Sequence, residues 1–156
     1  MKKPSKLLLL LLIFAAPIAF GAESTKTPDA LAALKDYKPT SPQINRAELD
    51  ALLAKPDQLL IIDLRRPDEI GSIGGFPVYL NIQFSELEKS LDFIPKDRTI
   101  VTVSNHAGRS GQTADLLTKK GFKVAGWVGA QYYEAEGGKL TKIAPPAPKP
   151  AKKHKH

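Results

Sequence analysis

The sequence of 156 residues contains no cysteine. Without that side chain the protein can form no disulfide bond, no thiolate metal site and no covalent intermediate on sulfur. Every cysteine-based mechanism is therefore excluded before any motif is considered. The composition is otherwise that of a globular protein, with 42% apolar and 25% charged residues, and the length suits one compact domain better than two.

The body of the chain also lacks an excess of charge of either sign. The formal net charge is +7, but seven of the basic residues lie in the first six and the last eight positions. In the remainder of the chain, basic and acidic side chains balance. A nucleic-acid-binding domain carries a basic face on the fold itself. We therefore expect no nucleic-acid partner.

The first 22 residues have the layout of a secretory signal peptide. A positively charged start, residues 1–6, precedes an uncharged and mostly apolar run at 7–20. That run is shorter than the roughly 20 apolar residues of a transmembrane helix, and the small residues Gly21 and Ala22 follow it. We predict cleavage near Gly21 or Ala22 and a periplasmic or secreted mature protein. Retention as an uncleaved membrane anchor is the alternative.

Strand and helix patterns alternate along the centre of the chain. Apolar spacing predicts a first helix through 44–53, with Ser41 as its N-cap and Pro42 as its first residue. Glycines predict a loop at 67–77. Strands that alternate with helices indicate an α/β fold with a parallel sheet. Strands are predicted at 59–62, 78–82, 99–103 and 122–128, and further helices at 84–91 and 110–120.

The same patterns divide the mature chain into three parts. Residues 23–40 contain several prolines among polar residues and predict a partly ordered lead-in. The domain itself is predicted at 41–144. Residues 145–156 are mostly proline, lysine, alanine and histidine, which build no core, and predict a disordered tail. At most, the lysines of this tail make a weak electrostatic contact with anionic lipids or envelope polymers.

One loop stands where parallel sheets bind ligands, beyond the carboxyl end of a strand. It leaves the strand at 99–103 and enters the helix at 110–120, so its backbone N–H groups and the helix dipole favour an anion. Arg109 adds a guanidinium suited to an oxyanion. Asp63 and Arg65, at the end of another strand, are predicted to support the loop as an ion pair or brace. The candidate anion-binding residues are Ser104, Asn105, His106, Ala107, Gly108, Arg109 and Ser110.

Three segments in this order resemble the rhodanese-like domain family. They are 63–70 (DLRRPDEI), the glycine-rich loop into 78–82 (VYLNI), and 100–110 (IVTVSNHAGRS). The resemblance covers roughly residues 40–142 and implies a small α/β domain with a central parallel sheet flanked by helices. Active members of the family transfer sulfane sulfur through a persulfide on a cysteine, which is the first of six loop residues ending in arginine. Ser104 stands at that position here, and the loop 71–75 lacks the histidine common in the family.

This departure decides the expected function. A hydroxyl is far more basic than a thiol and forms no persulfide, so we expect an inactive sulfurtransferase homologue. The leading hypothesis is an exported, non-catalytic binding module whose loop holds a small oxyanion, a sulfur species or the acidic group of a protein partner. One alternative is a residual transferase or hydrolase in which His106 and Asp63 serve Ser104 as nucleophile. The other is a protein-interaction domain with a vestigial loop.

The remaining polar and aromatic residues are interpreted without special chemistry. We expect no cofactor and no metal site, because His106 has no other ligands near it in the sequence and two further histidines lie in the tail. Trp127, Tyr132 and Tyr133 are interpreted as packing residues of the core or its rim.

Overall fold

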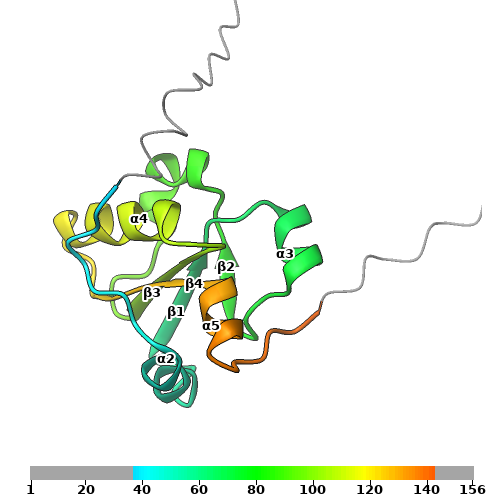
Figure 1. Ribbon diagram of the computed structural model, residues 1–156. Helices are drawn as coiled ribbons and strands as arrows, with labels where there is room; N and C mark the ends of the chain where they lie inside the picture. The colour runs from blue at the N-terminus through cyan, green and yellow to red at the C-terminus, as the bar shows by residue number, and fades with distance from the viewer. Residues whose placement is uncertain (1–36, 143–156) are drawn as a thin grey trace, which may run out of the picture.

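A parallel four-stranded sheet in the order β2-β1-β3-β4 forms the centre of the molecule (Figure 1). The computed structural model describes residues 37–142, and the predicted signal peptide and tail lie outside them. The predicted α/β fold is confirmed. The strands are β1 (Leu59–Asp63), β2 (Tyr79–Asn81), β3 (Thr99–Ser104) and β4 (Val124–Gly129).

Helices cover both faces of this sheet. They are α2 (Arg46–Leu53), α3 (Pro67–Ile73), α4 (Gly108–Lys119) and α5 (Ala130–Ala135), with the 3-10 helices η1 (Phe84–Glu86) and η2 (Glu88–Phe93). Successive strand residues point to opposite faces. Ile61 and Val101 therefore pack in the core under α2 and α5, whereas Ile62 and Ile100 pack in the core under α4 and the 3-10 helices. Among residues 37–142, no helix has the length and apolar character to cross a membrane.

The first helix begins later than the sequence predicts. α2 starts at Arg46, and Asn45 is its N-cap in place of Ser41. The Asn45 side chain accepts from the N–H of Glu48 at 3.0 Å, and the Glu48 carboxylate accepts from the N–H of Asn45 at 2.8 Å. This reciprocal pair satisfies two N–H groups that a helix start leaves open, so it outcompetes a start at Ser41 and Pro42.

The predicted cap residues instead run alongside β4. The Trp127 N–H donates to the Pro42 carbonyl, and the Ile44 N–H donates to the Trp127 carbonyl, each at 3.0 Å. Gly126 permits this approach, because it has a φ of +155° and a Cβ there would lie 2.9 Å from Ile44 Cγ2. Residues 42–44 thus pair with β4, the edge strand, and cover this edge of the sheet.

The glycine-rich segment predicted as a loop contains α3. Pro67 occupies the first helical position, and Glu69 accepts from the N–H of Arg66 at 2.9 Å. Gly71 is inside this helix, and a Cβ added to it would meet nothing within 4 Å outside the helix backbone. The loop prediction was wrong because the glycines outweighed the helix-start signal of Pro67 and Glu69. Gly74, at a φ of +115°, ends the helix.

The helix predicted at 84–91 is also different in the structure. It consists of η1 and η2, in which Glu86 and Ser90 donate their N–H groups three residues back, to Gln83 and Leu87. Leu87 is the deeply buried side chain of this stretch, and Phe84 and Leu91 pack partly buried against the same core. Short 3-10 turns suffice to place these side chains. The other predicted strands and the helix ending before Gly121 are present with shifts of one or two residues at their ends.

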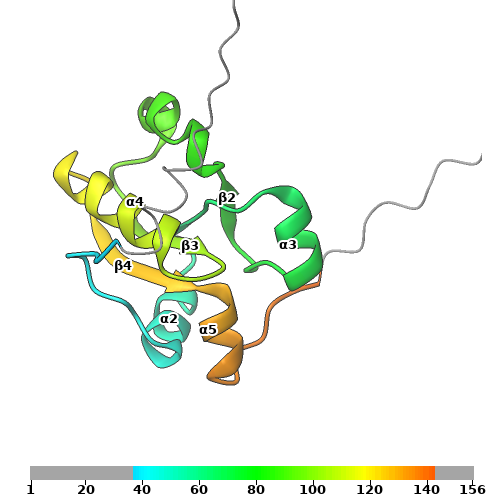
Figure 2. The same cartoon turned by 45° about the horizontal axis from the view of Figure 1, so that its top comes forward.

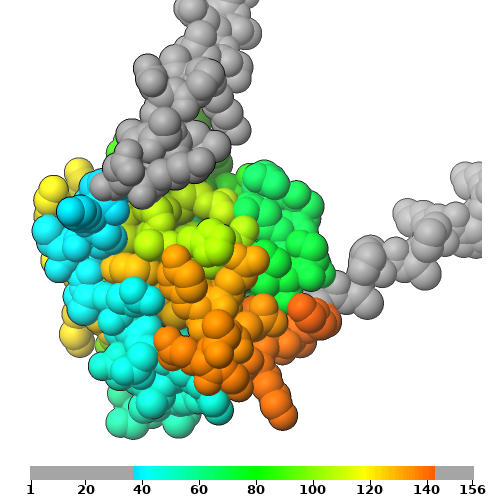
Figure 3. All heavy atoms as spheres, viewed as in Figure 1, coloured from blue at the N-terminus to red at the C-terminus, as the bar shows by residue number. Residues whose placement is uncertain are grey.

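Residues 37–45 are fastened to α4 through one buried carboxylate. Asp115 accepts from the Tyr37 hydroxyl at 2.8 Å and from the N–H groups of Thr40 and Ser41 at 2.9 and 2.6 Å. Burial alone raises the pKa of this carboxyl, but the donors outweigh burial and hold the pKa well below its ordinary value. Figure 3 shows the segment, in cyan, lying across the same face of the molecule as α5.

Candidate functional site

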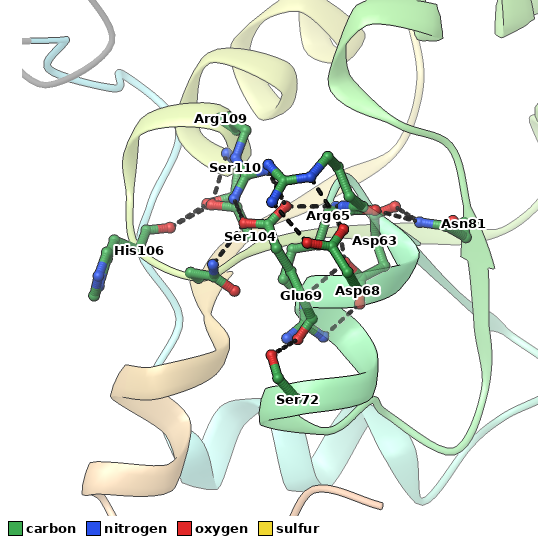
Figure 4. A network of polar contacts seen from close by, with 12 residues as sticks. Asp63, Arg65, Asp68, Glu69, Ser72, Asn81, Ser104, His106, Arg109 and Ser110 are labelled. Carbon is green, nitrogen blue, oxygen red and sulfur yellow. Dashed lines mark hydrogen bonds and ion pairs between the residues drawn. The ribbon is translucent and has the colours of Figure 1, made fainter. Parts of the chain in front are cut away.

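The carboxyl ends of three strands bring the candidate residues to one edge of the sheet. Asp63 of β1 is in register with Val103 of β3 and with Asn81 of β2. The loop 104–110 therefore begins beside Asp63. α3 leaves the end of β1 and stands next to the start of α4 in both views (Figures 1 and 2). Figure 4 shows the side chains that β1, β2, α3 and this loop contribute to one network.

Asp63 and Arg65 form an ion pair whose side chains are both 0% exposed. Arg65 Nε donates to one carboxylate oxygen at 2.9 Å, and Nη2 donates to the other at 2.7 Å and to the Gly74 carbonyl at 2.9 Å. The amide of Asn81 donates to the carbonyls of both Asp63 and Arg65 at 2.8 Å. The pair thus braces the turn between β1 and α3, and every carboxylate oxygen of Asp63 is engaged.

The Ser104 hydroxyl is enclosed within its own loop. Ser104 is 1% exposed, and its Oγ donates to the carbonyl of His106. The same oxygen accepts from the Ser110 N–H at 3.2 Å and lies 3.0 Å from the Ser110 hydroxyl. Ser110 Oγ in turn contacts the His106 and Ala107 carbonyls at 3.0 and 3.2 Å. The two serines tie the loop to the first turn of α4.

The histidine of the loop does not serve this serine. Ser104 contacts the backbone of His106, whereas the imidazole points away from the network in Figure 4. It lies against Tyr132, with the ring centroids 5.5 Å apart. The carboxylate of Asp63 is held by Arg65 and does not orient an imidazole. A nucleophile–base–acid arrangement is therefore not assembled in the described part of the chain.

The Glu69 carboxylate of α3 accepts hydrogen bonds from the side-chain donors of the loop. Glu69 Oε1 and Oε2 accept from Arg109 Nη2 and Nη1 at 2.7 and 2.9 Å. The amide of Asn105 donates to the same Oε1 at 2.7 Å. Together with the N–H of Arg66, four donors converge on this one carboxylate. The hydrogen bond from Arg109 is the chief reason that the pKa of Glu69 falls to about 2.

Glu69 does not stand out in the sequence, because it lies in the segment that glycines mark as a loop. The signal that identifies it is its place three residues after Arg66, with Pro67 between them, which is the spacing of a helix start with a capping glutamate. Of the predicted loop residues, Ser104, Asn105, Arg109 and Ser110 place their side chains in the network. Ala107 contributes backbone, as N-cap of α4.

The start of α4 supplies the electrostatic setting. α4 has 12 residues, and its N-cap residue, Ala107, has no side chain that could accept from the first turn. The Ser110 N–H of that turn is accepted by Ser104 Oγ instead. The N-terminal end of such a helix carries a partial positive charge and open N–H groups. Arg109 in that first turn adds a full positive charge. Both favour an anion over the loop, and in this structure the Glu69 carboxylate is that anion. Within residues 37–142, no cluster of histidine, aspartate and glutamate could hold a metal ion.

A separate hollow lies on the other side of α4. It has a volume of about 470 Å³ and is bounded by the 3-10 helices and by one face of α4. Phe84, Leu87 and Leu116 form its apolar wall, and Lys89 and Lys119 are among its polar residues. None of the residues 104–110 lines it, so the loop and this hollow are distinct features.

Comparison with known proteins agrees with the family resemblance seen in the sequence. The family model of the rhodanese-like domain matches residues 45–135. A sulfurtransferase from Allochromatium vinosum is 30% identical over 80 residues, which make up 51% of this chain and 74% of that protein.

Solved structures of the same architecture are similar to this one. A rhodanese-related protein from Thermoplasma volcanium superposes with a TM-score of 0.58 at 24% identity, over 65% of this chain and 98% of that chain. The polysulfide-sulfur transferase homodimer from Wolinella succinogenes has a TM-score of 0.58 at 22% identity, over 82% and 95% of the two chains. At these identities the likeness establishes the fold.

Proposed function

Because the chain belongs to the rhodanese-like domain family and has no cysteine, we propose that it is a non-catalytic binding module in which the loop 104–110 holds a small oxyanion or the acidic group of a partner protein. One observation carries this proposal: the carboxylate of Glu69 already rests on the loop donors Arg109 and Asn105. The loop thus binds an anionic group within its own chain, and the same donors suit an anion from outside.

The absence of sulfur transfer follows from the chemistry at the first loop position. The Ser104 hydroxyl forms no persulfide, since that intermediate needs a thiolate. Its oxygen is buried and engaged with His106 and Ser110. We therefore assign Ser104 a structural role, which is to close the loop around the start of α4.

The geometry of the donors suits a group with two or more oxygens. A guanidinium presents its N–H groups as a fork that pairs with a carboxylate, sulfate or phosphate. The two terminal nitrogens of Arg109 make this two-point contact with Glu69, and Asn105 adds a neutral donor. The buried brace of Asp63 and Arg65 fixes the start of the α3 segment that faces the loop. Small sulfur oxyanions and acidic side chains of a protein are the ligands this arrangement fits.

Thermal unfolding of the purified protein with sulfate, thiosulfate or phosphate would test the proposal. Sodium chloride at matched ionic strength is the reference. A ligand that binds the folded state raises the melting temperature by mass action. We expect a saturable rise that Arg109→Ala abolishes. Arg98→Ala is the matched control, because Arg98 precedes the amino end of β3, opposite the loop, and should leave the rise intact. A flat response up to millimolar concentrations would overturn the proposal.

We further propose that the protein works outside the cytoplasm, in the periplasm or as a secreted protein. The support is the signal-like pattern of residues 1–22 in the sequence. The mass of the protein recovered from a periplasmic fraction tests this. Loss of the first 21 or 22 residues is expected, and a full-length protein retained in the membrane fraction would contradict it.

A further inference from the structure

We propose that Glu69 is a built-in competitor for the anion site, so that an external anion binds by displacing the Glu69 carboxylate from Arg109 and Asn105. This inference rests on the proposed function and adds its regulation. In the described conformation, a carboxylate of the same chain then occupies the loop. The affinity for a ligand is then set by how easily α3 releases its glutamate.

The contacts support competition because one set of donors serves one anion at a time. Arg109 places both terminal nitrogens on Glu69, and the Asn105 amide is on the same carboxylate. While these contacts hold, the side-chain donors of the loop are engaged, and the charge of Glu69 repels an approaching anion. A binding-competent state that is only partly populated lowers the apparent affinity by that fraction.

The position of this ion pair makes exchange feasible. The side chains of Arg109 and Glu69 are 21% and 13% exposed, so water and a soluble anion reach the pair from the rim. By contrast, the Asp63–Arg65 pair is 0% exposed on both sides, where loss of a partner would leave a buried charge. The Asp63–Arg65 pair is therefore buried and braces the site. The Glu69–Arg109 pair is accessible to solvent and occupies the donors of the loop.

Protonation does not open the site near neutral pH. The pKa of Glu69 is about 2, so its carboxylate stays charged throughout the physiological range. Release must come from a stronger competing anion or from a partner that draws α3 away. A multivalent sulfur or phosphorus oxyanion competes better than a single carboxylate, because it offers more charge and more oxygens to the same donors.

Two substitutions that remove the same charge separate this mechanism from general electrostatics. Glu69→Gln breaks the two-point contact with Arg109. Asp68→Asn removes an equal charge one residue away, from a side chain that is 68% exposed and pairs with Arg66. By titration calorimetry with sulfate, thiosulfate and phosphate, we expect Glu69→Gln to bind at least about tenfold more tightly than the wild type. Asp68→Asn should stay within about twofold of it.

The outcomes distinguish the inference from the function on which it rests. Equal binding by the wild type and Glu69→Gln, abolished by Arg109→Ala, overturns the competition and leaves the anion site standing. Absence of binding in both proteins overturns the proposed function as well. If Glu69→Gln fails to fold, as judged by circular dichroism, Glu69→Asp replaces it. Its carboxylate is one methylene shorter, so a gain in affinity is expected and an unchanged affinity contradicts the inference.

Discussion

The hydroxyl oxygens of Ser104 and Ser110 lie 3.0 Å apart, and the N–H of Ser110 also donates to Ser104 Oγ at 3.2 Å. This contact joins the last residue of β3 to the first turn of α4. It gives the loop a fixed shape without a cysteine. The side chain at the first loop position therefore supports the structure of the loop.

A thiol introduced at position 104 should take up sulfur. In Ser104→Cys the sulfur lies at the start of α4 and near the N–H of Ser110, and this positive potential should lower the thiol pKa below the ~8.5 of a free cysteine. The thiolate should attack the outer sulfur of thiosulfate, forming a persulfide and releasing sulfite. Mass spectrometry should detect one added sulfur atom, which cyanide removes as thiocyanate. A thiol that titrates normally and takes up no sulfur would show that the loop differs from that of active relatives by more than one side chain.

The buried brace should contribute more to stability than the exposed ion pair beside it. Arg65→Met leaves Asp63 charged and unpaired in the interior, which costs about 3–5 kcal/mol of unfolding free energy. Arg66→Ala removes the Arg66–Asp68 pair, whose side chains are 59% and 68% exposed, and the 3.5 Å contact of Arg66 with Glu69. It should cost far less than Arg65→Met, because water screens these charges. Urea unfolding of the two variants measures both values. Similar losses in the two would contradict the assigned role of the Asp63–Arg65 pair.

Acid should weaken the fold partly through Glu69. Its pKa falls from an ordinary value of 4.5 to about 2 in the folded state, so its stabilising contribution is complete above pH 4.5 and is lost as the pH falls through 2. The unfolding free energy of the wild type should therefore decline across this window. Glu69→Gln should flatten the decline, as measured by urea unfolding between pH 2 and 6. An unchanged slope would mean that Glu69 is not held by Arg109 in solution.

Two glycines should respond in opposite ways to the same substitution. Gly126→Ala introduces a Cβ at a φ of +155° and at 2.9 Å from Ile44 Cγ2, so it should cost at least about 1 kcal/mol. Gly71→Ala lies in α3 with nothing within 4 Å, and should stabilise the helix by about 0.5–1 kcal/mol. Thermal unfolding of both variants checks the signs. A stabilised Gly126→Ala protein would contradict the close approach of residues 42–44 to β4.

The sheet could be predicted from the sequence because its strands are short apolar or β-branched runs. The Asp63–Arg65 contact could also be foreseen, since the two residues are close in sequence and lie at the end of β1. The contact between Glu69 and Arg109 could not, because it joins residues 40 positions apart and depends on the register of β1 against β3. It also depends on α3, which the glycines of that segment concealed.

The most direct test of the central claim is an NMR titration of the nitrogen-15-labelled protein with sodium thiosulfate at constant ionic strength. If the loop is an anion site, backbone amide shifts should saturate and concentrate in residues 105–110, with a parallel change at Glu69 as its carboxylate leaves Arg109. Shifts that grow linearly without saturation and spread over surface lysines would contradict a specific site in this loop.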